Sequence, residues 1–151
     1  MPKRIVISGY YGFGNTGDEA VLAGILTSFR HLRLDVEITV LSGDPERTRA
    51  AHPGVLAVHR YRVPQLIRAI GAADLVISGG GSLLQDATSA RSIFYYLFIL
   101  RLARVLRRKT MIYAQGVGPL IRPSARRAVA RALNRVDAIT LRDDDSQALL
   151  G

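Results

Sequence analysis

Glycine is concentrated in three segments that each follow a short apolar run. Nine of the 14 glycines lie in Gly9–Glu19, Gly79–Asp86 and Gln115–Pro119. Glycine costs backbone entropy, so this concentration indicates that the chain turns tightly there or approaches a ligand closely. The run of three glycines and a serine at 79–82 can also bind an anion through successive backbone N–H groups. The candidate ligand-binding residues therefore lie in these segments.

Charged side chains stand beside the glycines. Asp18 and Glu19 open a predicted helix, where the helix dipole favours carboxylates. We expect Glu19 to cap that helix and Asp18 to bind a sugar hydroxyl or accept a proton. Arg91 lies near the start of another predicted helix, where no dipole favours a cation. A phosphate or carboxylate ligand explains Arg91, and a surface ion pair with Asp86 explains it equally well.

The spacing Gly12-x-Gly14-x-x-Gly17 matches the glycine pattern of dinucleotide-binding loops. The preceding strand ends near Gly9, however, so the loop is too long for that motif. The carboxylate of Asp18 would also repel a pyrophosphate at the helix N-terminus. No Lys-Ser or Lys-Thr pair directly follows Gly17, which excludes a P-loop at this position. The sequence argues against nicotinamide binding.

Short apolar runs alternate with helical patterns along the chain. The runs are continuous in Val, Ile and Leu, as in strands that are covered on both faces. This order predicts a doubly wound, mainly parallel, Rossmann-like α/β sheet with helices on both faces. The predicted strands are 4–8, 36–41, 56–59, 75–78, 110–114 and 138–141. The predicted helices are 19–32, 45–51, 63–70, 92–108, 124–134 and 146–150.

Ligands of such a sheet bind beyond the carboxyl ends of its strands. The three glycine-rich segments and Arg142–Ser146 all follow predicted strands, so we expect them to meet at one edge. Helix ends are predicted from a capping box at Thr16–Glu19, a C-terminal Gly71 and a first-turn Pro123.

Length and composition bound the class of protein. The chain has 151 residues, enough for one domain, which we assign to residues 1–151. It has no cysteine, so disulfides, thiolate metal sites and a cysteine nucleophile are excluded. Its three histidines lack metal-ligand spacing. Met1 runs directly into a predicted strand and no apolar run approaches the roughly 20 residues of a membrane span, so we expect a cytoplasmic protein.

The net charge of +9 favours anionic partners. Two predicted helices carry arginine stripes, at Arg101, Arg104 and Arg108 and at Arg127, Arg131 and Arg135. A solvated face is the simplest interpretation of each stripe. Contact with an anionic membrane surface, at the inner face of the membrane, is the alternative. Nucleic acid is disfavoured because no aromatic residues are interleaved with the stripes.

Taken together, the segments resemble the polysaccharide pyruvyltransferase family, and most closely the bacterial branch that acts on secondary cell-wall polysaccharide. The resemblance covers nearly the whole chain, and four motifs in order are more specific than any one of them. The matching segments are Gly9–Leu22, Ile77–Asp86 with Ser89–Ser92 and Tyr95–Tyr96, Ala114–Leu120 and Arg142–Ser146.

The resemblance implies one half of a glycosyltransferase-B-like two-domain fold, with the C-terminal domain absent from this chain. It implies transfer of an enolpyruvyl-derived group from phosphoenolpyruvate to a lipid-linked or polymeric glycan, with formation of a cyclic ketal on an N-acetylmannosamine-like sugar. No metal or organic cofactor is implied. Because the residues that bind phosphoenolpyruvate are expected largely in the other half, this chain alone should be inactive.

The same resemblance gives the site residues their expected roles. Asp18 and Arg91 are the candidate catalytic residues, with Asp18 serving the acceptor hydroxyl and Arg91 facing the donor's negative charge. Asn15 and Gln85 would orient acceptor hydroxyls, and Arg142 is a weaker candidate for the donor. The remaining candidates for substrate binding are Gly17, Gly79, Gly80, Gly81, Ser82, Asp86, Gln115 and Gly116.

Two other functions remain open from the sequence. The domain could be the acceptor half of a nucleotide-sugar glycosyltransferase, which would release a nucleoside diphosphate instead of phosphate. It could also be a stand-alone Rossmann-like module that binds a nucleotide or an anionic polymer by itself.

Overall fold

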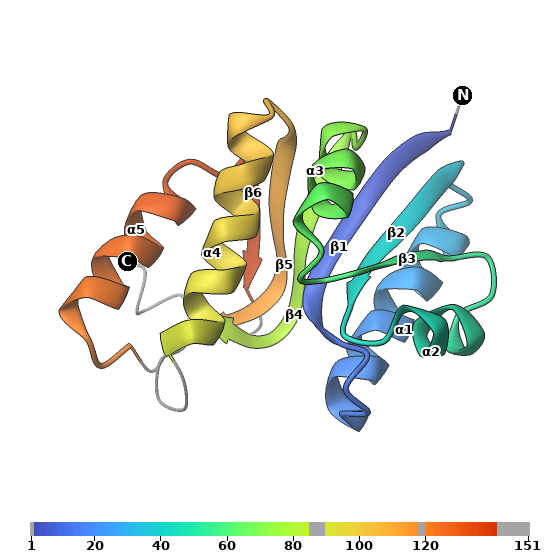
Figure 1. Cartoon of the computed structure of the whole chain (residues 1–151), viewed down its shortest axis with the longest axis horizontal. Coiled ribbons are helices and arrows are strands. Elements are labelled where there is room, and N and C mark those ends of the chain that lie inside the picture. Colours follow the sequence, from blue (N-terminus) through green and yellow to red (C-terminus); the bar gives the residue numbers. More distant parts are fainter. Residues whose placement is uncertain (1, 85–89, 118–119, 142–151) are drawn as a thin grey trace.

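Residues 2–84, 90–117 and 120–141 are described by the computed structural model, and in them six strands form one parallel sheet. The strand order is β3-β2-β1-β4-β5-β6, which confirms the predicted doubly wound fold (Figure 1). The strands are β1 (Lys3–Tyr11), β2 (Val36–Ser42), β3 (Leu56–His59), β4 (Leu75–Leu84), β5 (Lys109–Val117) and β6 (Ala138–Leu141). The helices are α1 (Thr16–His31), α2 (Pro45–Ala51), α3 (Val63–Gly71), α4 (Ala90–Val105) and α5 (Pro123–Leu133).

Helices cover both faces of the sheet, which explains the continuous apolar runs. Ile5 and Ile7 of β1 pack in a cluster with Leu22 of α1, whereas Val6 packs in another with α3 and α4. Successive strand residues point to opposite faces, so a strand between two helix layers has no polar side. Each fully buried Ile or Leu contributes about 1.5–3 kcal/mol. A third cluster joins α4, α5 and Ile112 of β5.

The central strands extend beyond their predicted carboxyl ends. β4 was expected to end at Ser78, but it continues to Leu84 and pairs Gly81 with Gln115 of β5. Pairing in a sheet uses only backbone groups, so a glycine run can continue a strand when its neighbour also continues. The glycine-rich segment at 79–81 is therefore strand and not loop.

Two predicted helix caps are wrong. Asn15, not Thr16, caps α1, because its Oδ1 accepts a hydrogen bond from the N–H of Asp18 at 3.2 Å. Gly71 is the last residue of α3 and is followed by Ala72 at φ −91°, so no left-handed residue ends that helix. Pro123 begins α5 as predicted.

Arginine ends α4 in the conformation that glycine usually adopts. Arg107 has φ 59°, and its N–H donates to the carbonyl of Arg104 at 2.9 Å. The N–H of Arg108 donates to the carbonyl of Ala103 at 2.8 Å, which completes a Schellman motif. The helix therefore ends at Val105, three residues before the predicted end at Arg108.

Candidate active site

The glycine-rich segments meet at the carboxyl edge of the central strands, as predicted. Ser8 of β1 pairs with Ser78 of β4, and Ser78 pairs in turn with Ile112 of β5. The chain proceeds outward from β1 to β2 and β3, then crosses back to place β4 on the other side of β1. This reversal between β1 and β4 is the topological switch point, where open α/β sheets bind their ligands.

Asp18 lies half-buried in the first turn of α1, next to the switch point. Burial raises the pKa of Asp18 above its ordinary value, and the neighbouring charge of Glu19 raises it further. Among the residues that the structure describes, no cation forms an ion pair with Asp18. A carboxylate with a raised pKa is a stronger base at neutral pH, so Asp18 is suited to accept a proton from a hydroxyl group.

Glu19 holds the loop that precedes α1 instead of completing the predicted capping box. Its Oε1 accepts a hydrogen bond from the N–H of Gly12 at 2.9 Å. Its Oε2 lies 3.7 Å from Nε2 of His52, a side chain that is largely buried. His52 lies at the C-cap of α2. Glu19 is thereby engaged in structure, so of the two carboxylates at the start of α1 it is Asp18 that is available for chemistry.

Tyr11 connects β1 to β4 at the switch point. Its side chain is 1% exposed, and its hydroxyl donates to the carbonyl of Gly79 at 3.4 Å. Burial raises the pKa of Tyr11, and the negative charge of Asp18 adds to this effect. Tyr11 therefore remains a neutral phenol that can donate a hydrogen bond.

Packing accounts for several of the glycines that were predicted to approach a ligand. A Cβ at Gly79 would lie 2.9 Å from the Tyr11 hydroxyl and 3.0 Å from Cδ1 of Ile25. A Cβ at Gly9 would overlap the ring of Tyr11. Gly12 adopts φ +85°, and a Cβ there would overlap Oγ of Ser42. Glycine is required at these positions by neighbouring protein atoms, whether or not a ligand binds.

Arg60 is a residue of this edge that the sequence did not reveal. It follows β3, is 3% exposed, and its guanidinium lies 4.2–5.9 Å from the centres of five aromatic rings. Its Nη1 donates to the carbonyl of Gly9 at 3.5 Å and its Nη2 to the hydroxyl of Tyr96 at 3.4 Å. Its Nε has no hydrogen-bond partner within the described part of the chain. The five rings are those of Tyr10, Phe13, Tyr61, Tyr95 and Tyr96.

The charges of Arg60 and Asp18 act on the same phenol. Burial raises the pKa of Tyr96, the nearby guanidinium of Arg60 lowers it, and the carboxylate of Asp18 raises it again. Burial likewise raises the pKa of Tyr95 to about 12 against the opposing charge of Arg60. The side chains of Asp18, Tyr11, Tyr96 and Arg60 therefore form one electrostatically connected group.

The other predicted site residues fall into three sets. Gly17 lies in the first turn of α1, Gly116 is buried in β5, and Arg91 lies exposed in the first turn of α4 (Ala90–Val105). Gly80, Gly81 and Ser82 lie in β4 and Gln115 in β5, where the structure describes their backbone. Gln85, Asp86 and Arg142 lie outside the described residues, and so does the proposed pair between Asp86 and Arg91.

A hollow of about 820 Å³ lies elsewhere, along β2, β3, α2 and α3. Side chains of both charges line this hollow, including Arg4, Glu37 and Arg62. It runs along the strands from their amino ends, and neither Asp18 nor Arg60 lines it. Within the described ranges, no group of histidine or carboxylate side chains could hold a metal ion. No helix in those ranges is long and apolar enough to cross a membrane.

A doubly wound sheet with a carboxylate, phenols and a guanidinium at its switch point defines a Rossmann-like domain suited to hydrogen bonding and proton transfer. The sequence pattern of the polysaccharide pyruvyl transferase family matches residues 15–151. The chain belongs to this transferase family.

Comparison with curated proteins finds no match. Among solved structures, S. aureus homoserine dehydrogenase at pH 7.0 is similar, with a TM-score of 0.49 and 14% sequence identity. The similarity covers 93% of this chain and 32% of the dehydrogenase chain, so this chain spans about a third of its length.

Proposed function

We propose that this domain binds and activates the acceptor in the transfer of a pyruvyl group from phosphoenolpyruvate to a polysaccharide sugar. The acceptor is an N-acetylmannosamine-like residue of a cell-wall or surface glycan. A second domain supplies much of the phosphoenolpyruvate site. The membership of the transferase family supports the reaction class. The observation that carries the assignment is Asp18, a half-buried carboxylate with a raised pKa at the switch point.

The reaction needs a base at the acceptor. Two sugar hydroxyls add to C2 of phosphoenolpyruvate, C3 gains one proton, and phosphate leaves with the other. Asp18 accepts the proton of the first hydroxyl as its oxygen attacks C2. The Oδ1 of Asn15 is occupied by the Asp18 N–H, so its Nδ2 is oriented to donate to a neighbouring hydroxyl. Arg91 and Arg142 are proposed to face the carboxylate and phosphate of the donor.

The test measures phosphate release from phosphoenolpyruvate and glycan-dependent ketal formation by the protein that contains both domains. The Asp18→Asn variant should lose roughly 100-fold or more in kcat while remaining folded, because a general base contributes about 10²- to 10⁴-fold. Wild-type turnover in this variant would remove Asp18 from the mechanism. Release of a nucleoside diphosphate from a nucleotide sugar, with no phosphate from phosphoenolpyruvate, would replace the proposal with the glycosyltransferase alternative.

A further inference from the structure

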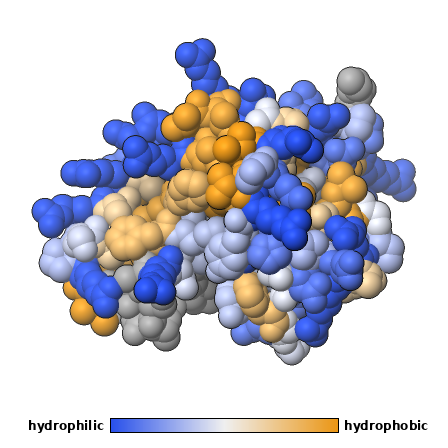
Figure 2. Space-filling model, viewed as in Figure 1, coloured by the Kyte–Doolittle hydropathy of each residue, from blue (hydrophilic) through white to orange (hydrophobic). Residues whose placement is uncertain are grey.

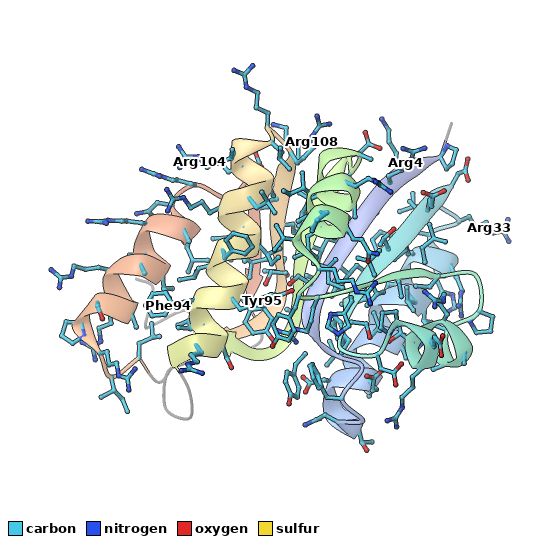
Figure 3. The ribbon with its side chains drawn as sticks, viewed as in Figure 1. Arg4, Arg33, Phe94, Tyr95, Arg104 and Arg108 are labelled. Atoms are coloured by element: carbon cyan, nitrogen blue, oxygen red, sulfur yellow. The ribbon has the colours of Figure 1, made fainter. Side chains whose placement is uncertain are left out.

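An aromatic cluster surrounds the buried guanidinium of Arg60. We define the cluster as the rings of Tyr10, Phe13, Tyr61, Tyr95 and Tyr96. These rings come from the end of β1 and its following loop, from the residue after Arg60, and from the first turns of α4. Tyr95 of α4 points toward the central strands in Figure 3. Its hydroxyl donates to the carbonyl of Arg60 at 2.8 Å, so Arg60 contacts the cluster through both backbone and side chain.

The buried guanidinium is held by aromatic faces instead of a carboxylate. No ion pair to Arg60 occurs in the described ranges, and its two side-chain hydrogen bonds are long, at 3.4 and 3.5 Å. Buried cations are normally paired, and stacking against several aromatic faces is the alternative means of stabilising one. Arg60 therefore fixes where the rings lie.

Three rings of the cluster present large surfaces to solvent. Tyr10 is 40% exposed, Phe13 is 42% exposed and Tyr61 is 63% exposed. Tyr10 and Phe13 stack in parallel, with 4.3 Å between ring centres. Exposed aromatic groups that gather on one surface mark a site of interaction. This surface lies close to the acceptor groups in sequence, since Phe13 precedes Asn15 by two residues.

The chemistry beside these rings suits a neutral sugar. A pyranose ring presents C–H groups on one face, which pack against aromatic rings, while its hydroxyls remain at the rim. Asn15 and Asp18 are a hydrogen-bond donor and acceptor for such hydroxyls. A nucleotide could also stack on the rings, but Asp18 and Glu19 would repel its phosphates.

We propose that Tyr10, Phe13 and Tyr61 form a stacking surface for a neutral sugar ring of the acceptor glycan, and that Arg60 is the positioning residue that holds these rings. The inference rests on the proposed function in one respect, that the acceptor is a glycan. It adds a binding surface and a positioning residue that the reaction chemistry does not itself require.

The first experiment measures binding without the donor. The probe is the methyl glycoside of N-acetylmannosamine, observed by saturation-transfer NMR with the full-length protein. Tyr10→Ala, Phe13→Ala and Tyr61→Ala should each weaken binding by roughly 2- to 10-fold, the range that an aromatic contact contributes. Phe94→Ala and Phe98→Ala are matched controls, because these rings are 47% and 44% exposed on α4 outside the cluster. Both controls should bind as the wild type does.

The second experiment isolates Arg60. Arg60→Met keeps the length of the side chain but removes the cation. It should lower the affinity for the glycoside and shift the ring resonances of Tyr10 and Phe13. Arg60→Lys, which retains a cation among the rings, should restore part of the affinity. If Arg60→Met fails to fold, the three ring variants still decide the question.

Two outcomes would overturn the stacking surface. One is unchanged glycoside binding in all three ring variants. The other is saturation transfer from the rings to uridine diphosphate and none to the glycoside. The proposed function can fail independently of the stacking surface. If the protein binds the glycoside through these rings but transfers no pyruvyl group, the reaction is refuted and the stacking surface is retained. Normal transfer with normal KM in the ring variants would refute the surface and retain the reaction.

A second surface rests on an independent observation, the charge of residues 87–136. This segment contains eleven Lys or Arg residues and no Asp or Glu. It includes α4 and α5, which pack against each other through Leu97, Leu100 and Val129. Arg104 is exposed on α4 and points outward in Figure 3. Arg108 follows the helix, and its Nη1 donates to the carbonyl of Ala73 at 3.4 Å. We call the outward side of α4 and α5 the basic face.

Apolar side chains are exposed among these arginines. Phe94, Phe98 and Val105 of α4 are 47%, 44% and 68% exposed. Residues at this spacing lie near one another on a helix surface. Figure 2 shows hydrophobic and hydrophilic residues side by side over this part of the molecule. Cations combined with exposed aromatic rings are the groups with which proteins contact an anionic lipid surface, whereas nucleic acid requires only the cations.

We infer that the basic face docks on an anionic lipid surface. The full-length protein should sediment with phosphatidylglycerol-containing vesicles and not with pure phosphatidylcholine vesicles. Arg101→Gln and Arg104→Gln should each lower the affinity roughly 5-fold, and Phe98→Ser should lower it without changing the dependence on salt. Arg30→Gln and Arg33→Gln, on the α1 end of the molecule, are the controls. Equal binding to both vesicle types, or tighter binding to duplex DNA than to vesicles, would overturn this inference.

Discussion

The hydroxyl of Tyr11 lies 3.4 Å from the carbonyl oxygen of Gly79, and this contact joins the carboxyl end of β1 to the middle of β4. The two residues are 68 positions apart in sequence. The Tyr11 side chain requires glycine at position 79, because a Cβ there would lie 2.9 Å from the Tyr11 hydroxyl. The switch point is thus filled by protein atoms beneath the surface on which a ligand would bind.

Gly79→Ala should destabilise the protein by about 1–3 kcal/mol, because the added methyl group overpacks a buried site. Removal of the hydroxyl in Tyr11→Phe leaves room, so Gly79→Ala should cost less in that background. Urea unfolding of the double-mutant cycle measures this difference. Gly24→Ala is the control, since Gly24 lies exposed in α1 with no atom within 4 Å of the added Cβ. It should stabilise the protein by about 0.5–1 kcal/mol. Additive costs at Gly79 and Tyr11 would contradict the packing argument.

Asn15→Ala should lower the free energy of unfolding by about 1 kcal/mol, because it removes the oxygen that accepts from the Asp18 N–H. Thr16→Ala is the matched control and should have little effect, because Thr16 lies within the first turn of α1. Thermal unfolding of both variants separates the two capping schemes. If Thr16→Ala lowered the free energy of unfolding more than Asn15→Ala does, Thr16 would be the N-cap residue, as predicted from the sequence.

Asp18 should make the stability of the fold depend on pH, and the sign of that dependence follows from its raised pKa. Its pKa is raised in the folded state, so its contribution to stability is fully present below the ordinary carboxyl pKa and is lost as the pH rises through the folded pKa. Asp18→Asn should therefore be more stable than the wild type at neutral pH, and the difference should shrink in acid. Unfolding midpoints measured over this range test the sign. A wild type that is the more stable of the two at neutral pH would show that the ionised carboxylate is favoured in the fold.

Arg60 should set the ionisation of Tyr95. Burial raises the pKa of this phenol to about 12, and the guanidinium holds it below the value that burial alone would give. Arg60→Met should therefore raise the pKa of Tyr95 further. Ultraviolet titration of Tyr95, identified by comparison with Tyr95→Phe, measures the change. A lower pKa in Arg60→Met would mean that the ring has become exposed and that Arg60 stabilises the fold around it.

The sequence predicts the fold closely where local signals bound an element. Strands 56–59 and 138–141 and the helix at 45–51 agree with the structure residue for residue, because turn or capping residues bracket them. The end of β4 was missed because its glycines have low strand propensity, and pairing with β5 overrides that preference. The ends of α1 and α4 were displaced because Arg33 and Arg107 adopt the positive φ that sequence patterns assign to glycine.

The candidate site was predictable in part for the same reason. Asn15 and Asp18 stand in a local pattern at a helix start, and the structure places them at the expected edge. Nothing local marks Arg60 as buried, since its surroundings are assembled from rings that are distant in sequence. A lone arginine after a short strand is more often exposed.

The ladder between β4 and β5 continues to Leu84 and Val117, well past the point where the apolar sequence stops. Much of the backbone at the proposed site is consequently held by strand pairing before any substrate arrives. A substrate that binds there immobilises little additional chain, so a smaller part of its interaction energy is lost to ordering. Adaptation to different glycans would then fall mainly to the short turn from Gly12 to Asn15, where Gly12 and Gly14 have positive φ.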